Sequence, residues 1–214
     1  MKRALIALCV CVLLAVVAVF APGRPVQAGN DAKSPTLAVE LSGSAETSST
    51  DSNFKEMADY CVKNGGEVVT RIPYFNTNDD NPKNWTRLVG QRTFCKFTAS
   101  DSSRIHVLLT TLYTKVPSLA ALAYYAKVPL GSGCNGNPAS CYCSQLGGSD
   151  LFGGINANGG GWVQMSDPVD TVLEACIFPD MSTIDSWGLA YHSAGIVRGK
   201  DLDHVLRFGD PYPK

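Results

Sequence analysis

The stretch Tyr60–Gly66, YCVKNGG, is the most informative segment of the sequence because it recurs as Tyr142–Gly148, YCSQLGG. A second matching segment follows each copy, Phe94–Phe97 (FCKF) after the first and Ala175–Phe178 (ACIF) after the second. The two cysteines of a copy lie 34 residues apart in the first and 33 in the second. This agreement in residue type, order and spacing indicates one supersecondary unit used twice.

The first 28 residues predict export from the cell. Met1–Arg3 is positively charged, Ala4–Ala21 carries no charge, and Val26–Ala28 ends in the small residue that signal peptidases require. This order is typical of a secretory signal peptide cleaved after Ala28. An uncleaved membrane anchor is the alternative, since the apolar run has about the minimum length for a span. We therefore expect a secreted or periplasmic protein.

The charge of the predicted mature chain excludes two classes of partner. Cleavage removes three of 18 basic residues and none of 19 acidic ones, which leaves 15 against 19 and a net charge of −4. A chain with this net negative charge is expected to bind neither nucleic acid nor an anionic membrane surface. No later apolar run is long enough to span a bilayer, so we expect no stable membrane insertion.

Composition divides the rest of the chain into three parts. Residues 29–52 are rich in Ser, Thr, Ala and Gly and contain no aromatic residue, which predicts a flexible linker. Residues 53–130 form the first, diverged repeat together with a connecting helix. Residues 131–208 form the second repeat.

Each repeat is predicted to open with a short helix. In the first, an apolar stripe at helical spacing starts near residue 53, and Gly65 ends it. In the second, Asn137 is the N-cap, Pro138 the first helical residue, and Gly147 ends the helix. The first cysteine of each repeat then lies in the last turn and faces the core.

Strands are predicted after each pair of glycines, from segments rich in β-branched and aromatic residues. The predicted strands are Glu67–Phe75, Leu88–Thr98, Ile105–Tyr113, Val172–Phe178 and Ile184–Tyr191. A polar turn, Asn76–Asn84, and a Gly-rich hairpin tip, Gly153–Gly161, are predicted between strands. Pro117–Lys127 is predicted to be a helix that packs the copies together. The fold class is therefore α+β, a tandem repeat of a small helix-plus-antiparallel-sheet unit.

Six cysteines remain after cleavage, and in an exported protein an even number indicates disulfides. Six cysteines allow 15 pairings. The repeat selects Cys61–Cys95 and Cys143–Cys176 and leaves Cys134 with Cys141. A C-x-C sequence without a thioredoxin-like pattern disfavours redox activity, and the spacing disfavours zinc.

The second repeat resembles a small bacterial exported domain of unknown function whose members are often labelled hemolysins. The resemblance rests on N-P-A-S-x-Y-C at Asn137–Cys143, on Gly147-Gly148, on Cys176–Asp180 and on the acidic residue and Trp within Ile184–Trp187. This chain departs from the family at Met181, where the family has Gly, in a longer segment between Gly148 and Cys176, and in the added Cys134 and Cys141. The family carries no known mechanism, and a shared fold does not transfer function.

Every motif residue has a structural interpretation. The two cysteines staple the helix, and Trp187 is expected to fill the core between helix and sheet. Tyr142 belongs to the apolar stripe of the helix. The remaining motif residues start or end the helix or make a turn: Asn137, Pro138, Gly147, Gly148, Pro179 and Asp180.

No pattern in the sequence predicts a catalytic, cofactor-binding or metal-binding residue. His106 is interpreted as a core or edge residue, His192 as a residue near a strand end, and Asp201–His204 as a solvated tail rather than a metal site. There is no G-x-S-x-G elbow and no phosphate loop. A carboxylate pair, Asp185 with Glu174, stays open as a guess for glycoside chemistry.

The sequence therefore predicts a non-enzymatic binding or structural module without a cofactor. Its expected ligand is an extracellular or periplasmic protein or a glycan, bound by the turn Asn76–Asn84 and the tip Gly153–Gly161, because loops on rigid scaffolds carry recognition. The alternatives are an inhibitor of a secreted hydrolase, which needs a rigid exposed loop beside a disulfide, a membrane-active protein as the hemolysin label suggests, and lastly an enzyme.

Overall fold

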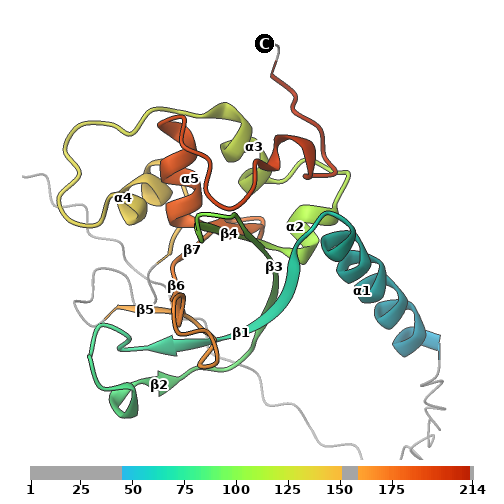
Figure 1. Cartoon of the computed structure of the whole chain (residues 1–214), viewed down its shortest axis with the longest axis horizontal. Helices are drawn as coiled ribbons and strands as arrows, with labels where there is room; N and C mark the ends of the chain where they lie inside the picture. The colour runs from blue at the N-terminus through green and yellow to red at the C-terminus, as the bar shows by residue number, and fades with distance from the viewer. Residues whose placement is uncertain (1–44, 151–158, 213–214) are drawn as a thin grey trace, which may run out of the picture. The chain divides into compact units, whose positions relative to one another are not determined.

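The computed structural model describes residues 45–150 and 159–212, with side chains from residue 51. Within these ranges helices pack against an antiparallel sheet, so the chain is α+β (Figure 1). The predicted signal peptide, residues 29–44 of the predicted linker and residues 151–158 of the Gly-rich tip lie outside the described residues.

Five α-helices and eight strands make up the described part of the chain. The helices are α1 (Ala45–Lys63), α2 (Leu109–Tyr113), α3 (Leu119–Ala126), α4 (Pro138–Gln145) and α5 (Ser186–Ser193). The strands are β1 (Glu67–Phe75), β2 (Thr86–Arg87), β3 (Arg92–Thr98), β4 (Arg104–Leu108), β5 (Gly160–Val163), β6 (Val172–Leu173), β7 (Ala175–Ile177) and β8 (Thr183–Asp185). Two 3₁₀ turns, Pro82–Asn84 and Leu202–His204, complete the description.

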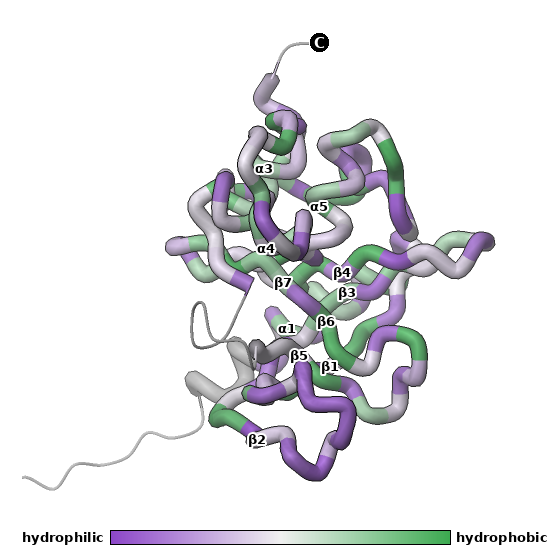
Figure 2. The backbone as a smooth tube through the Cα atoms, turned by 90° about the vertical axis from the view of Figure 1, so that its left-hand side faces the viewer, coloured by the Kyte–Doolittle hydropathy of each residue, from purple (hydrophilic) through white to green (hydrophobic). Residues whose placement is uncertain are grey.

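All eight strands belong to one antiparallel sheet in the order β6-β5-β1-β3-β4-β8-β7, with β2 paired to β1. The strands of the first half lie together in the middle of this order, and strands of the second half flank them on both sides, because β5 pairs with β1 and β8 pairs with β4. The sheet curls until it approaches a barrel (Figure 1). Helices α3, α4 and α5 gather at one end of it, and β2 and β5 lie at the other, in both views (Figure 2).

The structure forms the three disulfides that the repeat selects: Cys61–Cys95, Cys134–Cys141 and Cys143–Cys176. The two long ones have the same surroundings. A Cβ added to Gly66 would overlap Cys95 Sγ and lie 2.9 Å from Cys61 Sγ, and one added to Gly148 would overlap Cys176 Sγ and lie 2.9 Å from Cys143 Sγ. Glycine at these positions lets the chain leave the helix across its own disulfide.

The predicted helix ends are confirmed. Asn137 accepts hydrogen bonds from the backbone N–H groups of Ala139 and Ser140, with Pro138 at the first helical position. Gly65 and Gly147 both have a φ of 83°, the left-handed conformation that ends a helix. The predicted connecting helix, Pro117–Lys127, is present as the shorter α3, which Ser118 caps and from which Pro117 is excluded.

Two predicted strands are wrong after their first residues, where the chain continues as a helix. Ile105–Tyr113 is strand only to Leu108 and continues as α2, and Ile184–Tyr191 is strand only to Asp185 and continues as α5. The sequences are apolar on both faces, which suits a buried strand and a buried helix equally. At α5 the choice is made by Asp185, whose side chain accepts the Gly188 N–H and begins the helix.

Helix α1 begins at Ala45, inside the predicted linker. The prediction relied on the absence of aromatic residues, but a helix that is anchored at one end by packing extends without them. The predicted strand Leu88–Thr98 is also shorter, since β3 begins at Arg92.

The core divides between the two faces of the sheet. One cluster lies between the sheet and the helices and contains the two long disulfides with Phe97, Ile105 and Leu112. A smaller cluster on the other face, inside the curl, contains Val69, Phe94, Trp162, Leu173 and Ala175. Residues along β1, β3 and β4 alternate between these faces, as the period of a strand requires.

The prediction that Trp187 fills the core is wrong, because its side chain is only half-buried. The prediction of a solvated C-terminal tail is wrong as well. Leu202, Val205 and Leu206 are buried. Tyr125 Oη donates to the Phe208 carbonyl at 2.6 Å, and Tyr60 Oη donates to the Val205 carbonyl at 3.0 Å. The C-terminal segment therefore packs against both α3 and α1.

Candidate functional site

A pocket of about 630 Å³ opens between α5 and strands β5 and β6. Its walls combine aromatic, acidic and amide side chains with one guanidinium group. The lining residues are Thr77, Asn78, Gly160, Asp170, Val172, Leu173, Glu174, Asp185, Trp187, Tyr191, Ile196 and Arg198. A mixed apolar surface with a few convergent polar groups is typical of a small-ligand site.

Helix α5 supplies the aromatic wall of the pocket. Trp187 and Tyr191 are four residues apart and therefore lie on the same face of the helix. Their ring centroids are 5.8 Å apart with an interplanar angle of 32°. The Arg198 guanidinium lies 5.2 Å from the centroid of the Tyr191 ring. The same two aromatic residues also line a second, mostly apolar pocket of about 430 Å³ beside Pro129 and Leu130.

Glu174 joins three elements at the pocket wall. Its Oε2 accepts a hydrogen bond from Asn137 Nδ2 at 2.7 Å, so the N-cap of α4 also binds the carboxylate. The side chain of Trp187 lies close enough to the carboxylate to affect its pKa. Burial raises the pKa of Glu174, and the nearby carboxylates of Asp150 and Asp185 add to that rise, while Asn137 and Trp187 oppose it. Both the motif Asn and the motif Trp therefore act on one carboxylate.

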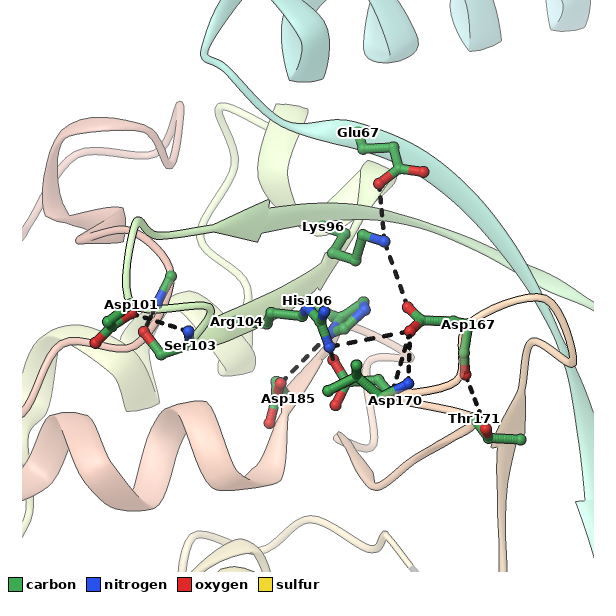
Figure 3. Close-up of polar contacts among 12 residues, drawn as sticks. Glu67, Lys96, Asp101, Ser103, Arg104, His106, Asp167, Asp170, Thr171 and Asp185 are labelled. Carbon is green, nitrogen blue, oxygen red and sulfur yellow. Dashed lines mark hydrogen bonds and ion pairs between the residues drawn. The ribbon is translucent and has the colours of Figure 1, made fainter.

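Asp185 connects the pocket to a buried polar chain inside the curl of the sheet (Figure 3). Asp185 Oδ2 lies 3.5 Å from His106 Nδ1, and His106 Nε2 lies 3.1 Å from Arg71 NH2. A guanidinium group cannot accept a hydrogen bond, so Nε2 is the acceptor and Nδ1, facing Asp185, carries the proton. Burial lowers the pKa of His106, although Asp185 opposes the shift, and the imidazole is neutral in this chain.

Arg71 is fully buried and is held from three directions. Its NH1 donates to the carbonyl groups of Trp162 at 3.2 Å and Asp170 at 2.6 Å. Its NH2 lies 3.6 Å from Asp167 Oδ2. Burial lowers the pKa of Arg71, and the carboxylates of Asp167 and Asp170 oppose the shift.

Asp167 is the centre of the charged end of this chain. Lys96 Nζ lies 3.3 Å from Asp167 Oδ2, and Arg104 NH1 lies 3.9 Å from Asp167 Oδ1. Lys96 Nζ also lies 2.8 Å from Glu67 Oε2. Burial alone would raise the pKa of Asp167. The N–H groups of Asp170 and Val169, together with Lys96, outweigh burial and lower the pKa to about 2. A carboxylate bound in this way is a fixed structural anion.

The two loops that the sequence singles out for recognition meet at this pocket. Thr77 and Asn78 come from the predicted polar turn, and Gly160 comes from the end of the predicted Gly-rich tip. The loops are adjacent because the Asn76 N–H donates to the Gly159 carbonyl at 2.8 Å. The rest of the tip, residues 151–158, lies outside the described residues.

The comparisons with known proteins assign no role to this pocket. A comparison with protein-family models, curated proteins and solved structures found no match to this chain. The resemblance of the second half to the exported domain labelled hemolysin therefore stays a prediction. None of the helices in the described ranges combines the length and the apolar character that a membrane span requires.

The motif residues of the second half divide between the core and the pocket. Tyr142, Gly147 and Gly148 hold α4 and its disulfide, and Tyr142 Oη donates to the Val128 carbonyl at 2.6 Å. Pro179 and Asp180 lie in the turn after β7. Asp180 Oδ2 also accepts the Leu119 N–H at 2.8 Å, so this turn helps to begin α3. Trp187 lines the pocket, and Asn137 contacts its wall through the hydrogen bond to Glu174.

The sequence analysis missed Arg71 and Asp167. Arg71 lies in a predicted strand, where a charged residue is expected to face solvent. Asp167 lies in Ser166–Asp170, which has the composition of an ordinary turn. The curvature of the sheet turns both side chains inward, and no local sequence pattern predicts that curvature. The guess that paired Asp185 with Glu174 did name two residues that line one pocket.

Proposed function

We propose that this protein is an exported, non-enzymatic binding module whose pocket at α5 takes a saccharide unit of an extracellular or periplasmic glycan. The observation that carries the proposal is the half-exposed Trp187 beside Tyr191, next to the polar groups of Asn78, Thr77 and Arg198. A sugar offers an apolar C–H face to an aromatic ring and hydroxyl groups to amides and charged groups. The three disulfides are typical of proteins in oxidising compartments.

The partners of the acidic residues favour binding over catalysis. Glu174 is held by Asn137, and Asp185 is held by the Gly188 N–H at 2.9 Å and faces His106. A general acid or nucleophile has to exchange protons or bonds with substrate, which these internal contacts oppose. We therefore assign the pair a role in shaping the pocket.

We further propose that the two halves are diverged copies of one unit. In each half, the residue after the two glycines pairs with the residue after the second cysteine. Glu67 lies opposite Lys96 in the first half, and Ser149 lies opposite Ile177 in the second. In each half the strand after the hairpin leads directly into a helix, β4 into α2 and β8 into α5. The second copy kept the motif residues, and its α5 carries the pocket.

Binding to immobilised oligosaccharides tests the function. A panel of neutral and acidic oligosaccharides is expected to contain at least one that the protein retains, and Trp187→Ala should weaken that binding at least tenfold. Tyr212→Ala is the matched control, since Tyr212 is an exposed aromatic residue (45%) that does not line the pocket. Retention by no member of the panel, or equal binding by Trp187→Ala, would refute the proposal. Release of new reducing ends would instead identify a glycoside hydrolase.

A second candidate function, inhibition of a secreted hydrolase, is favoured by one exposed loop. The chain from Pro129 to the Cys134–Cys141 disulfide is exposed but tethered. Gln145 accepts the Gly131 N–H at 2.7 Å and donates to the Pro129 carbonyl at 2.8 Å. A rigid loop beside a disulfide can occupy an active-site cleft at a small entropic cost. Inhibition of secreted hydrolases that Gln145→Ala weakens would support this candidate, and no inhibition would remove it.

A further inference from the structure

A second polar cluster lies away from the pocket, where the C-terminal segment packs against α5 and α3. His192 on α5 faces Asp201 and Asp203, which belong to the 3₁₀ turn Leu202–His204 and its cap. One ligand atom from each of these three residues lies within 4.8 Å of the other two. Imidazole nitrogen and carboxylate oxygen are both ligands of divalent transition metals.

His192 is the decisive member of the cluster. Its side chain is 4% exposed and its ring stacks on Tyr124 at 3.7 Å between centroids. Its Nε2 is buried and makes no hydrogen bond to any described residue, although it points toward Asp203 Oδ1 at 3.9 Å. A buried imidazole nitrogen without a hydrogen bond is costly. A metal ion is a partner that would remove that cost.

We propose that His192, Asp201 and Asp203 bind a divalent first-row transition metal ion such as Zn²⁺. One nitrogen and two carboxylate oxygens supply three ligands and leave a fourth position for water or another donor. Metal–ligand distances of about 2.0–2.2 Å require the three atoms to approach one another by roughly 1 Å. A rotation of the two aspartate side chains can supply this movement, because both come from one short turn.

The neighbouring groups fit the proposal. Lys127 Nζ lies 3.3 Å from Asp203 Oδ2, and its side chain is 42% exposed, so it can leave for solvent when a metal neutralises the carboxylate. Tyr124 Oη donates to Asp201 Oδ1 at 3.2 Å and fixes that ligand.

The bound ion would tie the C-terminal turn to α5 and so stabilise the protein. His204, the histidine next to these aspartates in the sequence, is exposed and is not a member of the cluster, whereas His192 is. The distance in sequence between His192 and the two aspartates hides this set from a search for local spacing.

Titration of the purified, oxidised, tag-free protein with Zn²⁺ and with Co²⁺ tests the site. We expect one ion per chain, a rise of several degrees in Tm, and a visible Co²⁺ absorption band. Asp203→Asn should weaken binding at least tenfold, and Asp201→Asn should do the same while it keeps the oxygen that accepts the Asp203 N–H at 3.0 Å. Ca²⁺ and Mg²⁺ should not compete, because they prefer all-oxygen sites.

Two variants separate a metal site from a purely structural cluster. Lys127→Met should tighten Zn²⁺ binding, because it removes a cation that competes for Asp203. His204→Ala should leave it unchanged, since His204 is the exposed histidine of the same segment. No uptake of Zn²⁺ or Co²⁺ by the wild-type protein, or uptake that depends on His204, would overturn the proposal.

Discussion

Val107 and Ile184 lie directly opposite each other in the antiparallel pair of β4 and β8. On its other side each of them lies opposite a disulfide cysteine, Val107 opposite Cys95 and Ile184 opposite Cys176. The proposed copies thus meet at equivalent residues, with one disulfide to either side of the contact.

Removing Cys61–Cys95 should cost more stability than removing Cys134–Cys141. The first closes a loop over 34 residues and the second a loop over 7. Chain entropy gives about 4 kcal/mol for the longer loop and about 2.5 kcal/mol for the shorter one. Urea unfolding of the two double Cys→Ala variants measures the difference. Equal losses would show that native packing, and not loop length, sets the contribution.

Gly148→Ala should destabilise the protein by several kcal/mol and leave thiols free. The new methyl group would overlap Cys176 Sγ, which lies in the core and cannot move aside. Gly209→Ala is the control, because nothing lies within 4 Å of a Cβ there and its φ is not positive. Thiol counting and thermal unfolding report the two effects. A fully oxidised, equally stable Gly148→Ala variant would contradict the described helix exit.

Met181→Gly should stabilise the protein by about 1 kcal/mol. Met181 has a φ of 66°, where a side chain costs about 1–2 kcal/mol and glycine costs little. The side chain is 59% exposed, so little packing is lost. Met165→Gly, at an equally exposed methionine without positive φ, should be neutral or slightly destabilising. A lower Tm for Met181→Gly than for the wild-type protein would contradict the prediction.

Stability should fall as the pH decreases from about 4 to about 2. The pKa of Asp167 is depressed to about 2 in the folded protein, against about 3.9 in an unfolded chain. Its contribution is therefore complete above the unfolded pKa and is lost as the pH approaches the folded one. Asp167→Asn should flatten this part of the curve of unfolding free energy against pH. An unchanged slope in the variant would show that other carboxylates cause the acid dependence.

Arg71→Met should cost about 3–5 kcal/mol, because it leaves Asp167 buried with one partner fewer and His106 without its donor. Arg87→Met, at an exposed residue of β2, should change stability little. Chemical unfolding of both variants checks the prediction. If the two variants lose the same stability, the chain inside the curl contributes nothing specific.

The sequence predicted those parts of the fold that local chemistry controls. The ends of α4, the full extent of β1 and the α+β class follow from Asn137, from the glycines and from β-branched segments. The extent of α5 and the partly exposed position of Trp187 do not follow from the sequence, because whether Asp185 caps a helix depends on its surroundings in the folded protein. The buried chain from Asp185 to Asp167 is non-local as well, since its members come from β1, β4, β8 and the turn before β6.

The position of the second half's strands on both flanks of the first half's strands has a consequence for any shortened form of the protein. A fragment that ends before α4 would keep β1, β3 and β4 but would lose β5 from one flank and β8 from the other. Its sheet would then have two open edges with unpaired backbone groups, which attract other chains. Such a fragment should therefore self-associate through these edges. One half of this protein is thus not expected to fold as an independent domain without the strands of the other half.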